Sequence, residues 1–69
     1  MNYEYIKKIT EGHTFPLSGT SDMGEPIIVE EGRTEDGEHY YRVEIAQDND
    51  WIRVEEYYSD GTVTESYEK

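Results

Sequence analysis

Three evenly spaced turn signals constrain the fold of this chain more than any other feature. Asp36-Gly37, Asp48-Asn49 and Asp60-Gly61 follow one another at intervals of 12 residues. Such pairs between alternating apolar residues are typical of tight β-hairpins, because Asp, Asn and Gly tolerate the backbone conformations that these turns need. We therefore expect a four-stranded antiparallel meander with strands at residues 26–34, 38–47, 50–58 and 62–68.

Side-chain pairing suggests a register for the second hairpin. A two-residue loop at Asp48-Asn49 places apolar pairs on one face of the sheet, Ile45 with Ile52 and Val43 with Val54. It places polar and aromatic pairs on the other face, namely Glu44 with Arg53, Arg42 with Glu55 and Tyr40 with Tyr57. Matched pairs of this kind each stabilise a sheet by roughly 0.2–1 kcal/mol. This register therefore predicts one apolar face and one charged face.

The same reasoning gives registers for the other two hairpins. A three-residue loop at residues 35–37, with Gly37 at positive φ, pairs Val29 with Val43, Ile27 with Ile45 and Glu30 with Arg42. A two-residue loop at Asp60-Gly61 pairs Tyr58 with Val63, Val54 with Tyr67 and Arg53 with Glu68. The charged face should then carry two ladders, Glu30-Arg42-Glu55 and Glu44-Arg53-Glu68.

The N-terminal segment is the expected cover for the apolar face. In "NYEYIKKITEG" the apolar residues Tyr5, Ile6 and Ile9 have helical spacing, and Gly12 is a stop signal. A helix of about two turns is expected, although the alternation of Tyr3 and Tyr5 is also compatible with a strand. Phe15 and Leu17 should fill one end of the core, residues 18–25 should form a loop, and Pro26 should begin an edge strand. The expected fold class is α+β, with one domain spanning residues 1–69.

The charge of the chain limits its partners. Seventeen Asp and Glu residues face six Lys and Arg residues, which gives a net charge of −11. This balance disfavours direct binding to nucleic acid or to an anionic membrane. The chain has no cysteine and no long apolar run, and we do not expect its N-terminal residues to act as a signal peptide, so the expected location is the cytoplasm. His13 and His39 are its two histidines and belong to no recognisable catalytic or metal motif, so neither an enzyme nor a cofactor is expected.

Acidic residues gather at two predicted places. The registers align Glu31, Tyr41, Glu56 and Glu65 in one row, and the turn around Asp36 adds further carboxylates. The row has two interpretations: it lies in water with Lys7 or Lys8 as a partner, or it is a rim that meets a basic protein. Turn geometry explains Asp36 and Gly37 but not the glutamates beside them. The candidate partner-binding residues are Glu30, Glu31, Glu35, Asp36, Gly37, Glu38, Glu56, Asp60 and Glu65.

Several short segments carry a family resemblance. "YIKKI", "TFPLSGT", "PIIVEE" and "EDGEHYYRVEI", in this order, resemble small acidic anti-CRISPR proteins of phages that inhibit type II CRISPR effector nucleases by mimicking DNA. The resemblance covers residues 4–46. It implies that residues 35–38 form a hairpin tip that reaches into the nuclease where its short flanking DNA motif is read. The family continues into helices, whereas the last third of this chain predicts strands.

These observations lead to one expected function and two alternatives. The expectation is a non-enzymatic inhibitor that acts in the bacterial host cytoplasm and blocks the DNA-binding groove of a CRISPR effector nuclease. An immunity protein, or an inhibitor of another nuclease or toxin, would use the same surface. A general protein-interaction module would instead use an aromatic face formed by Tyr40, Trp51 and Tyr57.

Overall fold

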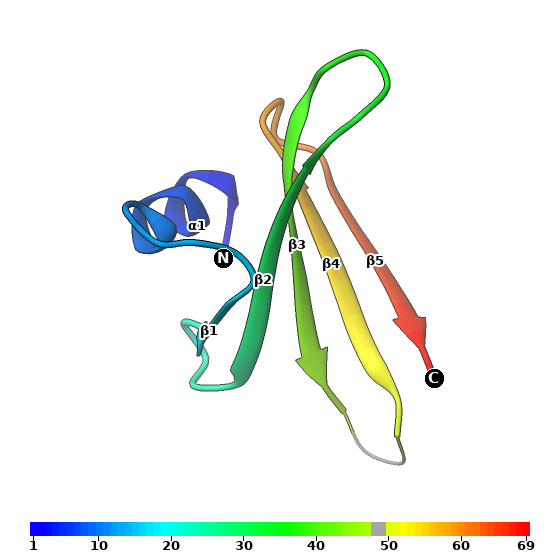
Figure 1. Ribbon diagram of the computed structural model, residues 1–69. Coiled ribbons are helices and arrows are strands. Elements are labelled where there is room, and N and C mark those ends of the chain that lie inside the picture. Colours follow the sequence, from blue (N-terminus) through cyan, green and yellow to red (C-terminus); the bar gives the residue numbers. More distant parts are fainter. Residues whose placement is uncertain (48–49) are drawn as a thin grey trace.

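The computed structural model describes residues 1–47 and 50–69. One helix precedes a five-stranded antiparallel sheet whose strands lie side by side in chain order (Figure 1). The elements are α1 (Tyr3–Thr10), β1 (Leu17–Thr20), β2 (Pro26–Arg33), β3 (His39–Ala46), β4 (Ile52–Tyr58) and β5 (Val63–Glu68). The α+β class, the N-terminal helix and the antiparallel meander are confirmed, but the sheet has five strands and not four.

The additional strand, β1, lies where a loop was expected. Leu17 pairs with Val29 and Thr20 pairs with Pro26, so β2 is an inner strand and Pro26 does not begin an edge strand. Pro26 is nevertheless tolerated, because it is the first residue of β2. The segment Leu17–Thr20 has no apolar periodicity, and three of its four residues are exposed. Backbone pairing with β2 therefore defines this strand, which explains why no side-chain pattern revealed it.

Helix α1 begins with a side-chain cap. The Asn2 side chain accepts a hydrogen bond from the Tyr5 backbone N–H at 2.8 Å, which satisfies one of the free donors of the first turn. Ile6 is fully buried, and Thr10 is nearly so. The helical interpretation of this segment is confirmed. No helix in residues 1–47 and 50–69 is long and apolar enough to cross a membrane.

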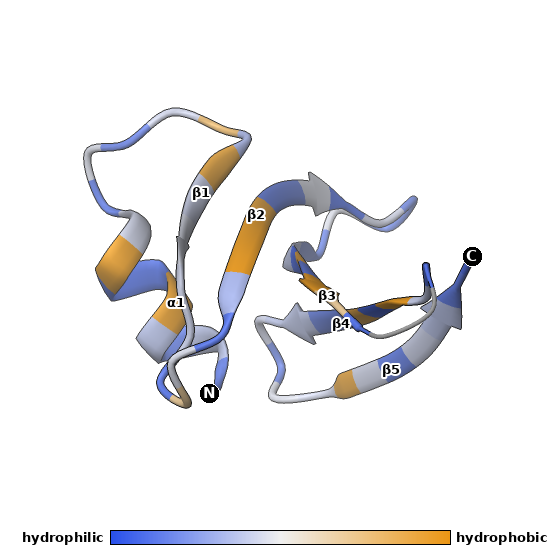
Figure 2. Cartoon of the chain, turned by 90° about the horizontal axis from the view of Figure 1, so that it is seen from below, coloured by the Kyte–Doolittle hydropathy of each residue, from blue (hydrophilic) through white to orange (hydrophobic). Residues whose placement is uncertain are grey.

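The core lies between α1 and one face of the sheet. Its buried residues are Ile6, Ile27, Val29, Tyr41, Val43, Ile45 and Tyr57. Phe15 packs against this cluster as expected, whereas Leu17 is only half-buried. Hydrophobic stretches of β2 and β3 stand out among the elements of Figure 2, and α1 does not extend over β4 and β5 (Figure 1). The face that carries the core is called the helix side below, and the opposite face is called the outer face.

The four hairpins use the same kind of loop. Backbone N–H groups of Ser21, Thr34, Gln47 and Tyr58 donate to the carbonyls of Glu25, Glu38, Trp51 and Thr62, respectively, at 2.8–2.9 Å. Each pair encloses three residues, and the third residue has positive φ in every case: Gly24, Gly37, Asp50 and Gly61. This left-handed third position is typical of three-residue hairpin loops. The predicted loop around Gly37 and the predicted β2–β3 register are confirmed.

The predicted β3–β4 register is wrong by one residue. Gln47 pairs with Trp51, so Arg42 faces Glu56, Glu44 faces Val54 and Ile45 faces Arg53. The predicted two-residue loop, Asp48-Asn49, lies outside the described residues. Asp50 takes a positive φ of 66°, a conformation that Asp tolerates better than most residues. A shift of one residue moves every side chain of β4 to the other face relative to β3.

The predicted β4–β5 register is also wrong by one residue. Tyr57 faces Val63, Glu55 faces Glu65 and Arg53 faces Tyr67. The loop contains three residues, Ser59, Asp60 and Gly61, because Tyr58 pairs with Thr62. Asp60 accepts a hydrogen bond from the Thr62 backbone N–H at 2.8 Å, which favours this longer turn. Neither predicted charge ladder forms, since the observed row is Glu30, Arg42, Glu56 and Thr64.

Candidate functional site

The β2–β3 and β4–β5 turns lie next to each other at one end of the sheet (Figure 1). Glu38 joins them, because its Oε2 atom accepts hydrogen bonds from the Asp60 backbone N–H at 3.1 Å and from the Ser59 hydroxyl at 3.3 Å. The Ser59 backbone N–H also donates to the carbonyl of His39 at 3.1 Å. Carboxylates that are distant in sequence therefore meet here. We call this group the acidic hairpin end: Glu35, Asp36, Glu38 and Asp60.

Local hydrogen bonds keep the two aspartates of the acidic hairpin end ionised. A hydrogen bond with the Thr34 side chain, followed by one with the Glu38 backbone, lowers the pKa of Asp36 below its ordinary value. Hydrogen bonds with the backbone and the side chain of Thr62 lower the pKa of Asp60 in the same way. The carboxylates of Asp36 and Asp60 therefore stay ionised to a lower pH than that of an ordinary aspartate.

Gly37 has the structural role expected of it. It is the last residue of the β2–β3 loop and has a φ of 91°. Its carbonyl accepts a hydrogen bond from the Arg33 guanidinium at 2.8 Å. The basic side chain of Arg33 is therefore held against this turn. Gly37 contributes shape to the acidic hairpin end, and the carboxylates around it contribute the charge.

The predicted acidic row does not exist. The row that contains Glu31 continues through Tyr41 and Tyr57 to Val63. Glu56 lies on the outer face, opposite Arg42, and Glu65 lies on the helix side, opposite Glu55. The cause is the pair of register shifts, each of which reverses the faces of the following strand.

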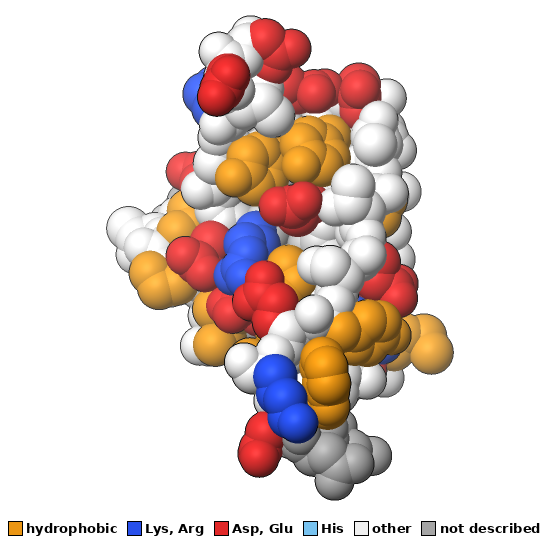
Figure 3. Space-filling model, turned by 90° about the vertical axis from the view of Figure 1, so that its right-hand side faces the viewer, with side chains coloured by type: hydrophobic (Ala, Val, Ile, Leu, Met, Phe, Trp, Pro, Cys, Tyr) orange, Lys and Arg blue, Asp and Glu red, His pale blue; other side chains and the backbone are white. Residues whose placement is uncertain are grey.

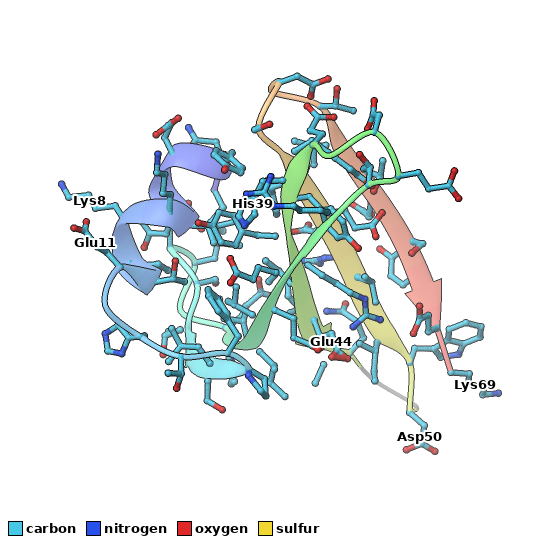
Figure 4. All side chains as sticks on the ribbon, turned by 45° about the horizontal axis from the view of Figure 1, so that its top comes forward. Lys8, Glu11, His39, Glu44, Asp50 and Lys69 are labelled. Atoms are coloured by element: carbon cyan, nitrogen blue, oxygen red, sulfur yellow. The ribbon has the colours of Figure 1, made fainter. Side chains whose placement is uncertain are left out.

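Glu31 belongs to a contact between helix and sheet. Its carboxylate lies 2.8 Å from Nε2 of His39, whose Nδ1 lies 2.8 Å from the Tyr3 hydroxyl. A carboxylate only accepts, so in the neutral ring Nε2 carries the hydrogen and Tyr3 donates to Nδ1. Figure 4 shows His39 on the side of the sheet that faces α1. Glu31 therefore orients His39 and is not part of the acidic hairpin end.

Arg42 is the centre of the charges on the outer face. Its guanidinium lies 3.1 Å from Glu44, 3.3 Å from Glu68 and 3.5 Å from Glu30. Figure 3 shows this face, with acidic side chains around a basic side chain below the acidic hairpin end. Desolvation lowers the pKa of Arg42, but the carboxylates beside it, led by Glu44, outweigh that effect and raise it. Three glutamates on one arginine leave this part of the face negative.

The aromatic residues are distributed differently from the prediction. Tyr57 is buried in the core, and that burial raises the pKa of its hydroxyl. Trp51 is 41% exposed and has the Lys69 ammonium 5.4 Å from its ring centre. Tyr40 stacks on Tyr58, with ring centres 5.2 Å apart. The predicted face of Tyr40, Trp51 and Tyr57 therefore does not form, and the neighbour of Tyr40 is Tyr58 and not the predicted Tyr57.

Arg53 lies on the helix side and not on the charged outer face. Its guanidinium is 3.3 Å from both Glu25 and Glu55. Its Nε atom is buried and is not aligned for a hydrogen bond with Glu55, although the two groups are at ion-pair distance. The ion pair with Arg53 offsets the desolvation cost of the Glu55 carboxylate, which is largely buried beside the core.

The described residues provide a charged surface without the arrangement of a metal centre. Within residues 1–47 and 50–69, no group of three His, Asp or Glu side chains is placed to hold a metal ion. The features that the structure does bring together are the acidic hairpin end and, beside it, the Tyr40–Tyr58 pair. Comparisons of the chain with protein-family models, with curated proteins and with solved structures find no match.

Proposed function

We propose that this protein is a non-enzymatic inhibitor whose acidic surface mimics nucleic acid and blocks the DNA-binding groove of a CRISPR effector nuclease. The observation that supports this most directly is the junction at Glu38. It holds the carboxylates of two turns at one end of the sheet by hydrogen bonds to Ser59 and Asp60. A charge array fixed in this way loses little entropy on binding, which favours it as a recognition surface.

The mechanism is electrostatic competition. Glu30 on β2 and Glu56 on β4 extend the negative surface along the outer face from the acidic hairpin end. A net charge of −11 attracts a basic groove over long distances and accelerates association at low salt. The affinity should fall as salt screens the field.

The nature of the target rests on the resemblance of residues 4–46 to anti-CRISPR proteins of phages. In the proposed complex, Glu35, Asp36 and Glu38 take the place of the phosphates in the groove where the flanking DNA motif is read. The part of the chain in which that family has helices is here β4 and β5. Asp60 in the loop between these strands supplies acidic charge from this region.

A charge-reversal experiment tests the placement of the surface. The test variant is Glu35→Lys with Asp36→Lys, because both side chains lie at the exposed tip. The control variant combines Glu4→Lys in α1 with Glu11→Lys, directly after α1, and it changes the net charge equally. Glu11 points away from the sheet (Figure 4). DNA cleavage by a purified, guide-loaded type II effector is measured against inhibitor concentration.

We expect the tip variant to need a roughly tenfold higher concentration for half inhibition, and the helix variant a roughly twofold higher one. Circular dichroism must show that both variants retain the sheet. Equal losses in both variants would mean that net charge alone matters, and this would contradict the proposed site. Undiminished inhibition by the folded tip variant would contradict it as well.

A further inference from the structure

The outer face carries an aromatic platform beside the acidic hairpin end. Gly32, Tyr40 and Tyr58 lie in one row across β2, β3 and β4. The Tyr40 ring lies over Gly32, since a Cβ atom added there would be 2.7 Å from its hydroxyl. The two tyrosine rings are tilted by 32° with centres 5.2 Å apart. Both residues are half-exposed, and α1 lies on the other side of the sheet (Figures 1 and 3).

A carboxylate borders this platform and differs from its neighbours. Glu56 lies in the next row and accepts hydrogen bonds from the Thr64 hydroxyl at 2.9 Å and from the Tyr58 hydroxyl at 3.2 Å. Glu30, Glu44 and Glu68 are engaged by Arg42. Within the part of the chain that the structure describes, no lysine, arginine or histidine lies at ion-pair distance from Glu56. Its negative charge is therefore oriented by hydroxyl groups and is not neutralised.

We propose that Tyr40, Tyr58 and Glu56 form a site for an arginine side chain of a basic protein partner. The planar guanidinium stacks on the tyrosine rings while it donates hydrogen bonds to the Glu56 carboxylate. Arginine fits this arrangement better than lysine, whose ammonium is a compact and strongly hydrated point charge. This inference rests on the proposed function, because it specifies one contact between the acidic surface and the groove of its target.

Charge complementarity supports a basic protein as the occupant. The outer face presents four glutamates, Glu30, Glu44, Glu56 and Glu68, against one arginine, Arg42. A nucleic acid would be repelled by this face, although aromatic pairs of this kind can stack on bases. Arginines in a nucleic-acid groove are positioned to hold phosphates, and here the carboxylate of Glu56 would take the phosphate's place.

The test uses poly-arginine and poly-lysine peptides of equal length as probes of the full-length protein. The test variant is Glu56→Gln, which retains an oxygen acceptor for Tyr58 and Thr64. The matched control is Glu30→Gln, which makes the same change in charge in the same row of the same face. Affinities are measured by isothermal titration calorimetry at two salt concentrations, and the contact is located by NMR shifts of backbone amides.

The proposal predicts that the wild-type protein binds poly-arginine more tightly than poly-lysine, with amide shifts centred on Tyr40, Glu56 and Tyr58. Glu56→Gln should weaken poly-arginine binding roughly tenfold, and Glu30→Gln by no more than roughly twofold. Equal effects of the two substitutions, equal binding of the two peptides, or no binding would each overturn it. These outcomes are independent of nuclease inhibition, so the arginine site and the proposed function can fail separately.

Discussion

The Glu38 carboxylate accepts a hydrogen bond from the Asp60 backbone N–H at 3.1 Å, and this contact joins the β2–β3 turn to the β4–β5 turn across 22 residues of sequence. The same oxygen also accepts from the Ser59 hydroxyl. Hydrogen bonds to a charged group are stronger than those between neutral groups. Glu38 therefore has both a structural role, holding two turns together, and an electrostatic one, adding charge at their junction.

Replacement of Glu38 tests its structural role. Glu38→Ala removes both contacts and should lower the free energy of unfolding by about 1 kcal/mol, because the site is exposed to competing water. Glu35→Ala, three residues earlier, removes a charge but neither of these two hydrogen bonds. It should change the free energy of unfolding by less than about 0.5 kcal/mol. Urea unfolding monitored by Trp51 fluorescence measures both values. Equal changes in the two variants would contradict the bridging role of Glu38.

The pKa values of Asp36 and Asp60 predict a dependence of stability on pH. Both values lie below the ordinary 3.8 in the folded protein, so protonation of either side chain opposes folding. Their contribution to stability should be complete above that ordinary value and should disappear as the pH falls through the lower folded values. NMR titration of the side-chain carboxyl carbons measures the folded pKa values directly. A folded pKa at or above 3.8 for either residue would contradict this account.

The contact between Gly32 and Tyr40 predicts an effect of adding a single methyl group. Gly32→Ala should displace the Tyr40 ring from the β2 backbone and from Tyr58, at a cost of about 1 kcal/mol in stability. Gly19→Ala is the matched control, because a Cβ atom at that strand position meets nothing within 4 Å. Thermal unfolding measures the stability, and NMR shifts of the tyrosine ring protons report the stacking. An unchanged Tyr40–Tyr58 environment in Gly32→Ala would contradict the described packing.

The hydrogen bond between Tyr3 and His39 predicts how firmly α1 is attached to the sheet. Tyr3→Phe keeps the ring but removes the hydroxyl that lies 2.8 Å from Nδ1 of His39. The expected loss is about 1 kcal/mol of unfolding free energy. Tyr5→Phe is the control, because Tyr5 is 36% exposed on the same helix. Similar unfolding midpoints for the two variants would show that the hydroxyl of Tyr3 contributes nothing.

The part of the fold that could be read from the sequence is the part in which loop chemistry and side-chain pairing agree. The β2–β3 hairpin is of this kind, since a loop ending at Gly37 also pairs Val29 with Val43. Asp60-Gly61 occupies the same two positions of its loop as Asp36-Gly37 does, and reading both in the same way would have given the observed β4–β5 register. At Asp50 the sequence has no glycine to mark the positive φ, so the additional loop residue was hidden.

The candidate site was less predictable than the fold, because it depends on register and on contacts between loops. Glu35, Asp36, Glu38 and Asp60 do lie together at one end of the sheet, whereas Glu31 and Glu65 lie on the helix side. The Glu38 junction depends on side chains distant in sequence and has no local signal. Tyr58 became the neighbour of Tyr40 only through the shift of one residue in β4. An error of one residue in a strand boundary has little effect. The same error in the register between two strands changes which side chains share each face of the sheet.

In the proposed function, the acidic surface competes with DNA for one groove. Binding of the protein to a purified, guide-loaded type II CRISPR effector nuclease, with and without DNA that carries the flanking motif, tests it most directly. We expect binding that is abolished by the DNA and weakened strongly between low and roughly 0.5 M salt. Failure to bind, or simultaneous binding of the protein and the DNA, would contradict it.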